Sequence, residues 1–157
     1  MQQLIRRYAG PVLLSALAAL LCSCARVNDA GLSLVSTKRD AYLIVNGQLF
    51  SGEVRLVPDR TGRVSFSAEK GVISSCSGSM RYTATNNGEV DLHCSDGSQV
   101  VLQTTLLSET RGYGYGSTAQ GPSSMVFGMD EQDVRAFLTV PSGMTLAPGE
   151  RGALELR

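Results

Sequence analysis

The sequence predicts a mainly β domain: an antiparallel meander of hairpins that forms a curved sheet or small barrel, with one short C-terminal α-helix. Composition supports this prediction. The chain contains 17 glycines and no tryptophan, and Val, Thr, Ser and Tyr dominate its middle, as in β-rich domains with many turns. Apolar and polar residues also alternate along several stretches, and a period of two indicates a strand with one buried face.

An internal repeat indicates the order of the hairpins. Residues 51–71 align without a gap with residues 77–97, at a spacing of 26 residues. Each unit is expected to be a β-hairpin, that is, a strand, a turn ending in glycine, and a second strand. The identical pairs are Ser51/Ser77, Gly52/Gly78, Arg55/Arg81, Gly62/Gly88, Val64/Val90 and Gly71/Gly97.

The β domain is expected to span residues 41–128, after a tether over residues 24–40 that is polar and mixed in sequence. A short first strand at the end of the tether is the alternative. Asn46-Gly47 between two apolar runs predicts a tight hairpin, because both turn positions tolerate positive φ. Strands are also predicted at 99–107 and 125–127, with a loop over 117–124 between them.

Residues 129–157 are predicted to pack on the same domain through a short helix. Asp130 is expected to cap this helix, with Asp133 three residues on as in a capping box, and Pro141 is expected to end it. Residues 153–156 either add an edge strand or extend freely. The expected apolar face of the helix consists of Val134, Phe137 and Leu138.

The first 23 residues are predicted to be a signal peptide. Arg6 and Arg7 form a basic start, and residues 11–22 form an apolar run of about a dozen residues, shorter than the ~20 that span a membrane. The run ends in Leu21-Cys22-Ser23-Cys24.

This ending resembles the lipobox of bacterial lipoproteins, with Leu at −3, a small residue at −1 and Cys24 as the first residue after cleavage. The resemblance implies a covalent lipid on Cys24 that anchors the protein to a membrane. Ala25 at position +2, in place of aspartate, implies the outer membrane. An ordinary cleaved signal is the alternative.

Cysteine usage predicts one disulfide. Cys22 leaves with the signal and Cys24 carries lipid, so Cys76 and Cys94 have only each other in an oxidising compartment. Alternation places Cys94 on the buried face of its strand, although the predicted turn leaves Cys76 out of register. A bulge near Ser77-Gly78 is expected to correct the offset. A redox or metal role for the two cysteines is the alternative.

Charge and chemistry limit the function. Without the signal, 12 basic and 14 acidic residues remain, scattered along the chain, so no nucleic-acid partner is predicted. His93 is the only histidine, and we interpret it as an exposed strand residue beside Asp91, without a catalytic role. Too few ligands are present for zinc, so no metal and no cofactor are predicted.

The run Gly112-Tyr113-Gly114-Tyr115-Gly116 places both tyrosines on one face if it is extended. They either pack into the core or, together with Arg111, contact a ligand such as a glycan or an envelope protein.

The predicted function is a lipid-anchored, non-enzymatic envelope component with a structural, assembly or binding role. The first alternative is a periplasmic inhibitor or ligand-binding protein that uses the 111–124 loop. The predicted plan, a small lipid-anchored β domain with one disulfide, is similar to that of membrane-bound lysozyme inhibitors. Phe127-Gly128 before a short acidic segment also resembles that plan. An enzyme is the second alternative.

Overall fold

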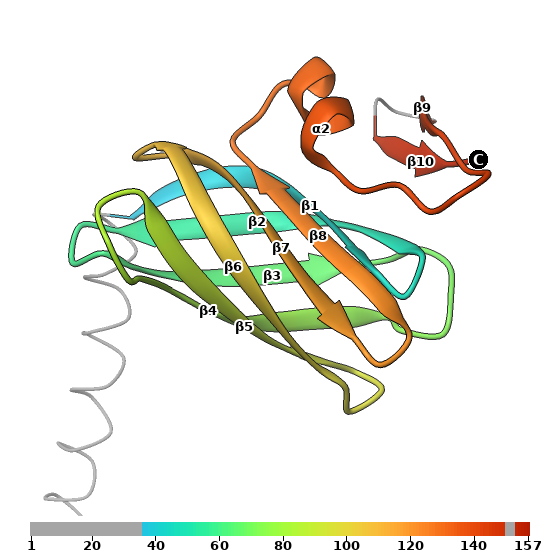
Figure 1. Ribbon diagram of the computed structural model, residues 1–157, viewed down its shortest axis with the longest axis horizontal. Coiled ribbons are helices and arrows are strands. Elements are labelled where there is room, and N and C mark those ends of the chain that lie inside the picture. Colours follow the sequence, from blue (N-terminus) through green and yellow to red (C-terminus); the bar gives the residue numbers. More distant parts are fainter. Residues whose placement is uncertain (1–35, 150–152) are drawn as a thin grey trace, which may run out of the picture. The chain divides into compact units, whose positions relative to one another are not determined.

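Eight antiparallel strands close into a barrel in the computed structural model, which describes residues 36–149 and 153–157 (Figure 1). The strands follow one another around the barrel in chain order, and the last pairs with the first. The predicted fold class is thereby confirmed, with the closed barrel as its specific form. The strands are β1 (Thr37–Val45), β2 (Gln48–Val57), β3 (Thr61–Ser67), β4 (Ser75–Tyr82), β5 (Asn87–Cys94), β6 (Gln99–Ser108), β7 (Arg111–Thr118) and β8 (Gly121–Phe127).

The first hairpin forms where the Asn-Gly signal predicted it. Asn46 and Gly47 have φ of 53° and 74°, and Val45 pairs with Gln48 across a two-residue turn. The tether was predicted over residues 24–40, with a short first strand at its end as an alternative, and Thr37–Asp40 do pair with β2 as the start of β1. This part of β1 has exposed residues, so it lacks the apolar alternation by which a strand is recognised.

The repeat corresponds to two hairpins with the same register, β2–β3 and β4–β5. Gly52 pairs with Phe66, and Gly78 pairs with Leu92, each partner shifted by the same 26 residues. A Cβ on Gly52 would lie 2.0 Å from the carbonyl oxygen of Ser65, and a Cβ on Gly78 would lie 1.8 Å from the equivalent oxygen of the second unit. The repeated glycine therefore permits close approach of two neighbouring strands.

Two details of the repeat were predicted incorrectly. Gly62 and Gly88 do not end turns but pair within the hairpins, with Leu56 and Tyr82 respectively. Because the second turn therefore lies at residues 83–86, the register of β4 and β5 brings the two cysteines directly opposite each other without a bulge. The bulge predicted near Ser77-Gly78 was wrong.

The prediction for residues 117–124, in the second half of the barrel, was also wrong. Residues 117–124 were predicted to be a loop, but Ser117 and Thr118 continue β7 and pair with Pro122 and Gly121 of β8. Only Ala119 and Gln120 form the turn. The small and polar residues of this stretch concealed a strand pair, since apolar alternation is the main sequence signal of a strand.

Large side chains that point inward from every strand except β7 form the barrel core, as expected when eight strands enclose an interior just wide enough for side chains. The buried face predicted for Cys94 of β5 is confirmed, because Cys94 is 8% exposed and Val90 and Leu92, on the same face, are fully buried. The largest fully buried side chains of this core are Phe50, Phe127, Leu43, Met80, Leu92, Leu102 and Met125.

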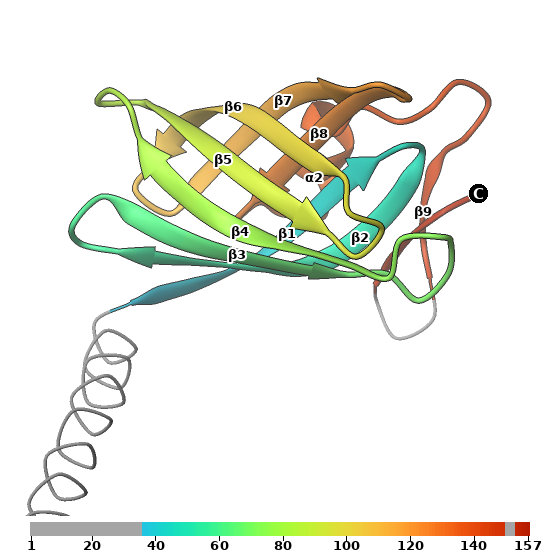
Figure 2. The same ribbon diagram turned by 90° about the horizontal axis from the view of Figure 1, so that it is seen from below.

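The C-terminal segment packs on the outside of the barrel through helix α2 (Glu131–Phe137) and two short paired strands, β9 (Leu146–Pro148) and β10 (Leu154–Leu156) (Figure 2). The predicted cap is confirmed, since the Asp130 side chain accepts a hydrogen bond of 3.0 Å from the backbone N–H of Asp133. The helix ends at Phe137, four residues before Pro141. A second apolar cluster joins this segment to the barrel, and its buried members are Ile44, Val126, Val134, Leu138, Leu146 and Leu154.

Among the described residues, no helix is both long enough and apolar enough to cross a membrane.

Replacement of Gly78 by alanine tests the close approach of the strands. Since the new Cβ would meet backbone oxygen at 1.8 Å, we expect Gly78→Ala to lower the free energy of unfolding by about 3 kcal/mol or more. In the control Gly97→Ala, the Cβ meets no atom within 4 Å, but φ is +85°, so a loss of only about 1 kcal/mol is expected. Equal losses in denaturant unfolding would contradict this account.

Candidate functional site

The run 111–116 lies in β7, and its two faces have different roles. Gly112 and Gly114 face the barrel interior, where a Cβ on Gly112 would lie 2.8 Å from the Phe127 ring. The glycines therefore make room for the core, and no outside molecule occupies their face. Tyr113 and Tyr115 point outward, so they are not part of the barrel core.

Both tyrosines contact the C-terminal helix. The ring of Tyr113 stacks on that of Phe137, with 4.6 Å between centroids and 22° between planes. The hydroxyl of Tyr115 donates a hydrogen bond of 2.8 Å to the carbonyl oxygen of Phe137. Burial raises the pKa of the Tyr115 hydroxyl, and the neighbouring Tyr113 adds to this, which keeps the donor proton in place.

Arg111 completes the contact. Its guanidinium pairs with the carboxylate of Asp133 in the first turn of α2. The three residues that were predicted to contact a ligand thus hold α2 against β7. Tyr115 retains 43% exposure and is the one of the three that still presents substantial apolar surface outward.

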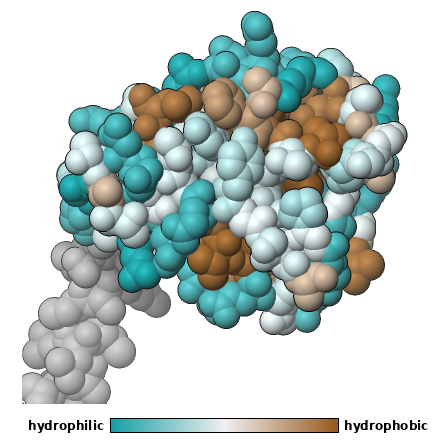
Figure 3. All heavy atoms as spheres, in the orientation of Figure 1, coloured by the Kyte–Doolittle hydropathy of each residue, from teal (hydrophilic) through white to brown (hydrophobic). Residues whose placement is uncertain are grey.

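The helix partner of these tyrosines was not predicted, although a signal for it exists. An amphipathic helix needs an apolar surface to cover, and a strand with outward tyrosines supplies one. Figure 3 shows the surface on this side of the molecule: brown, apolar residues form several patches, in the upper part of the face and also below its centre, among teal and white residues.

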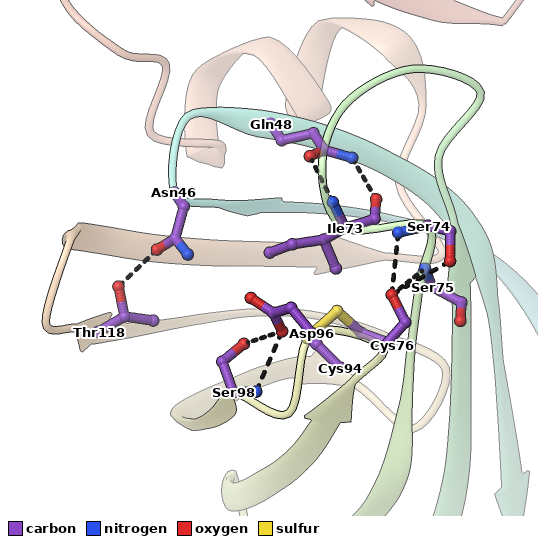
Figure 4. The surroundings of a disulfide bond; sticks show 11 residues. Asn46, Gln48, Ile73, Ser74, Ser75, Cys76, Cys94, Asp96, Ser98 and Thr118 are labelled. Atoms are coloured by element: carbon purple, nitrogen blue, oxygen red, sulfur yellow. Dashed lines mark hydrogen bonds between the residues drawn. A yellow bond between two sulfur atoms is a disulfide. The ribbon is translucent and has the colours of Figure 1, made fainter.

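The predicted disulfide is confirmed. Cys76 and Cys94 are bonded across the ends of β4 and β5 (Figure 4), and Cys76 is 1% exposed. Closing such a loop stabilises a small domain by about 3 kcal/mol on the chain-entropy model. Beside it, the Gln48 side chain donates to the carbonyl and accepts from the N–H of Ile73. The bond and the buried Ile73 together close this end of the barrel core.

His93 lies on the outer face of β5, with 70% of its side chain exposed. Its Nε2 is 3.9 Å from Oδ1 of Asp91, and the same oxygen accepts a hydrogen bond from Gln99. Within residues 36–149 and 153–157, no group of three or more His, Cys, Asp or Glu side chains is placed to hold a metal ion. Cys24 lies outside the described residues.

Sequence reasoning missed a line of basic residues on the outer face of β1, β2 and β3. In the strand register, Lys38 of β1 lies opposite Arg55 of β2, and Arg55 lies opposite Arg63 of β3. Three cations therefore occupy successive cross-strand positions. We call these three residues the cationic row. Glu53 forms ion pairs with Lys38 and Arg55. Hydrogen bonds from these two residues lower the pKa of the Glu53 carboxyl, and the bond from Lys38 has the larger effect. The cationic row could not be recognised in the sequence, because Lys38, Arg55 and Arg63 lie on three different strands and are brought together only by strand register.

Comparison with known proteins adds little to this geometry. No protein-family description matches the chain, and no curated protein matches it significantly. A solved structure described as a redesigned beta barrel is similar to it, with a TM-score of 0.47 and 21% sequence identity over 64% of this chain and 95% of that chain. The class of protein therefore rests on the strand pairing itself: a small, closed, eight-stranded antiparallel barrel with one disulfide.

Truncation of the tyrosines tests whether they serve the fold. We expect Tyr113→Ala to lower the free energy of unfolding by about 2 kcal/mol because it removes the stacking on Phe137, and Tyr115→Phe to lower it by about 1 kcal/mol through loss of the hydrogen bond. Val72→Ala, at a position that is 93% exposed, is the control and should change little. If Tyr113→Ala unfolds in denaturant like the control, the tyrosines do not hold the helix.

Proposed function

We propose that the protein is a lipid-anchored, non-enzymatic component of the bacterial cell envelope, with a binding or structural role. The observation that carries the proposal is the sequence Leu21-Cys22-Ser23-Cys24 at the end of a short apolar run that follows two arginines. A small barrel whose interior is filled by its own side chains is compatible with such a role.

In this proposal, Cys24 carries a diacylglyceryl group on sulfur and an acyl group on its amine. Each buried methylene contributes about 0.8 kcal/mol, so one chain binds a membrane marginally, whereas two or three chains anchor it permanently. Ala25 after the lipidated cysteine favours the outer membrane. The barrel would then work outside the cytoplasm, where its disulfide is stable.

The placement of reactive side chains supports a non-enzymatic role. Catalysis needs groups that converge on one position in a cleft. His93 instead lies on the exposed outer face of a strand, with its nearest carboxylate at 3.9 Å. The alternative of an inhibitor with a projecting 111–124 loop loses its main support, because these residues form paired strands and Arg111 and Tyr113 contact α2.

Acyl labelling tests the proposal. In cells that are given radiolabelled palmitate, we expect the wild-type chain to carry label and to fractionate with membranes, and Cys24→Ser to lose both, because the acceptor sulfur is absent. Cys22→Ser is the matched control, since it removes the neighbouring thiol and leaves Cys24 and Ser23 intact. Label that persists on Cys24→Ser, or disappears from Cys22→Ser alone, would refute the assignment of Cys24.

A further inference from the structure

Charge is distributed unevenly between the two halves of the barrel. Residues 37–82, which contain β1–β4, have seven basic and four acidic residues, a formal charge of +3. Residues 83–149, which contain β5–β8 and α2, have two basic and seven acidic residues, a formal charge of −5. A chain whose total charge is close to zero thus folds into a barrel with one positive and one negative side, and such asymmetry favours an oppositely charged partner.

The cationic row lies on the positive side, across β1, β2 and β3. Like charges directly opposite each other on neighbouring strands are unfavourable, yet Lys38, Arg55 and Arg63 occupy three such positions. The side chains of Lys38 and Arg55 remain 58% and 49% exposed. The carboxylate of Glu53 pairs with both of these cations, so Lys38, Arg55 and Glu53 together carry one positive charge. Arg81, which is 71% exposed and forms an ion pair with Glu89, extends the same surface on β4.

The row also begins next to the segment that would connect the barrel to its anchor. Lys38 is the second residue of β1 and follows Cys24 by 14 residues, a length of chain that reaches at most roughly 50 Å. A lipid on Cys24 would therefore keep the barrel within this distance of the membrane surface. Binding of the tethered domain to that surface is then intramolecular, so a weak attraction is sufficient.

We propose that the cationic row, extended by Arg81, docks the barrel onto the anionic phospholipid headgroups of the membrane that holds its anchor. The lipid on Cys24 supplies the attachment, and the row supplies the orientation, with β1–β3 toward the bilayer and β5–β8 away from it. A membrane is favoured over other partners because the row adjoins the tether and because headgroup phosphates form a charged layer that can meet three aligned side chains at once. The proposal rests on the proposed function, since the tether matters only if Cys24 is lipidated.

Residue-specific arginine modification tests the orientation on the mature, lipidated chain. The protein is reconstituted on vesicles of phosphatidylcholine alone and on vesicles with about a third phosphatidylglycerol, and phenylglyoxal labelling of each arginine is followed by mass spectrometry. We expect Arg63 to react several-fold more slowly on the anionic vesicles. Arg157, which is 61% exposed near the C-terminus, should react equally on both. About 0.5 M NaCl should abolish the difference by screening.

Two variants identify the source of the protection. Lys38→Gln/Arg55→Gln removes two charges from the row but retains Arg63 as the reporter, and should weaken docking roughly thirtyfold, so that Arg63 reacts as on neutral vesicles. Lys70→Gln/Arg157→Gln is the matched control, because it removes two exposed cations outside the row and should leave the protection of Arg63 unchanged.

The outcomes separate this proposal from the anchor. Flotation with neutral vesicles reports the lipid anchor, and failure there refutes the anchor. Flotation with both vesicles but equal reactivity of Arg63 on them refutes docking and leaves the anchor intact. Arg63 could instead be protected on neutral vesicles, to an extent that increases with protein density. That result would show that the cationic row binds the negative side of a second copy, and would also refute docking on lipid.

Discussion

The barrel depends on the pairing of β1 with β8, which joins strands that lie about eighty residues apart in the sequence. Only Ala41–Ile44 and Ser124–Phe127 form this closure, and β8 is buried on both faces there. Met125 and Phe127 enter the barrel core, whereas Val126 and Ser124 face the C-terminal segment. Closure therefore creates an apolar outer surface that must itself be covered, and α2 covers it.

The glycines of β7 fulfil a second condition for closure. Gly112 and Gly114 lie opposite Phe127 and Met125, so their missing side chains leave room for two of the largest core residues. The tyrosines between them then supply the outer surface on which Phe137 packs. One alternating sequence thus serves the interior through its glycines and the exterior through its tyrosines, and this explains an unusual composition without an external ligand.

Local signals in the sequence predicted the parts of this fold that depend on neighbouring residues. The Asn46-Gly47 turn, the Asp130 cap and the strand faces of the repeat all follow from short-range conformational preferences. The pairing of Ser117 and Thr118 with residues 121–122 was missed because the residues of this stretch are small or polar, and the start of β1 was missed because it is exposed. The cationic row and the contact of the tyrosines with α2 arise only from pairing between distant strands and from packing, and no single segment contains that information.

Amide hydrogen exchange tests most directly whether α2 secures the closing strands. In Val134→Ala/Leu138→Ala, which reduces the buried face of α2, we expect amides of residues 42–44 and 124–126 to exchange at least about tenfold faster, because this pairing becomes the least stable part of the barrel. Amides of residues 64–66 and 90–92, which lie in hairpins that α2 does not cover, should change much less. Uniform acceleration throughout the barrel, or none at β1 and β8, would contradict the account.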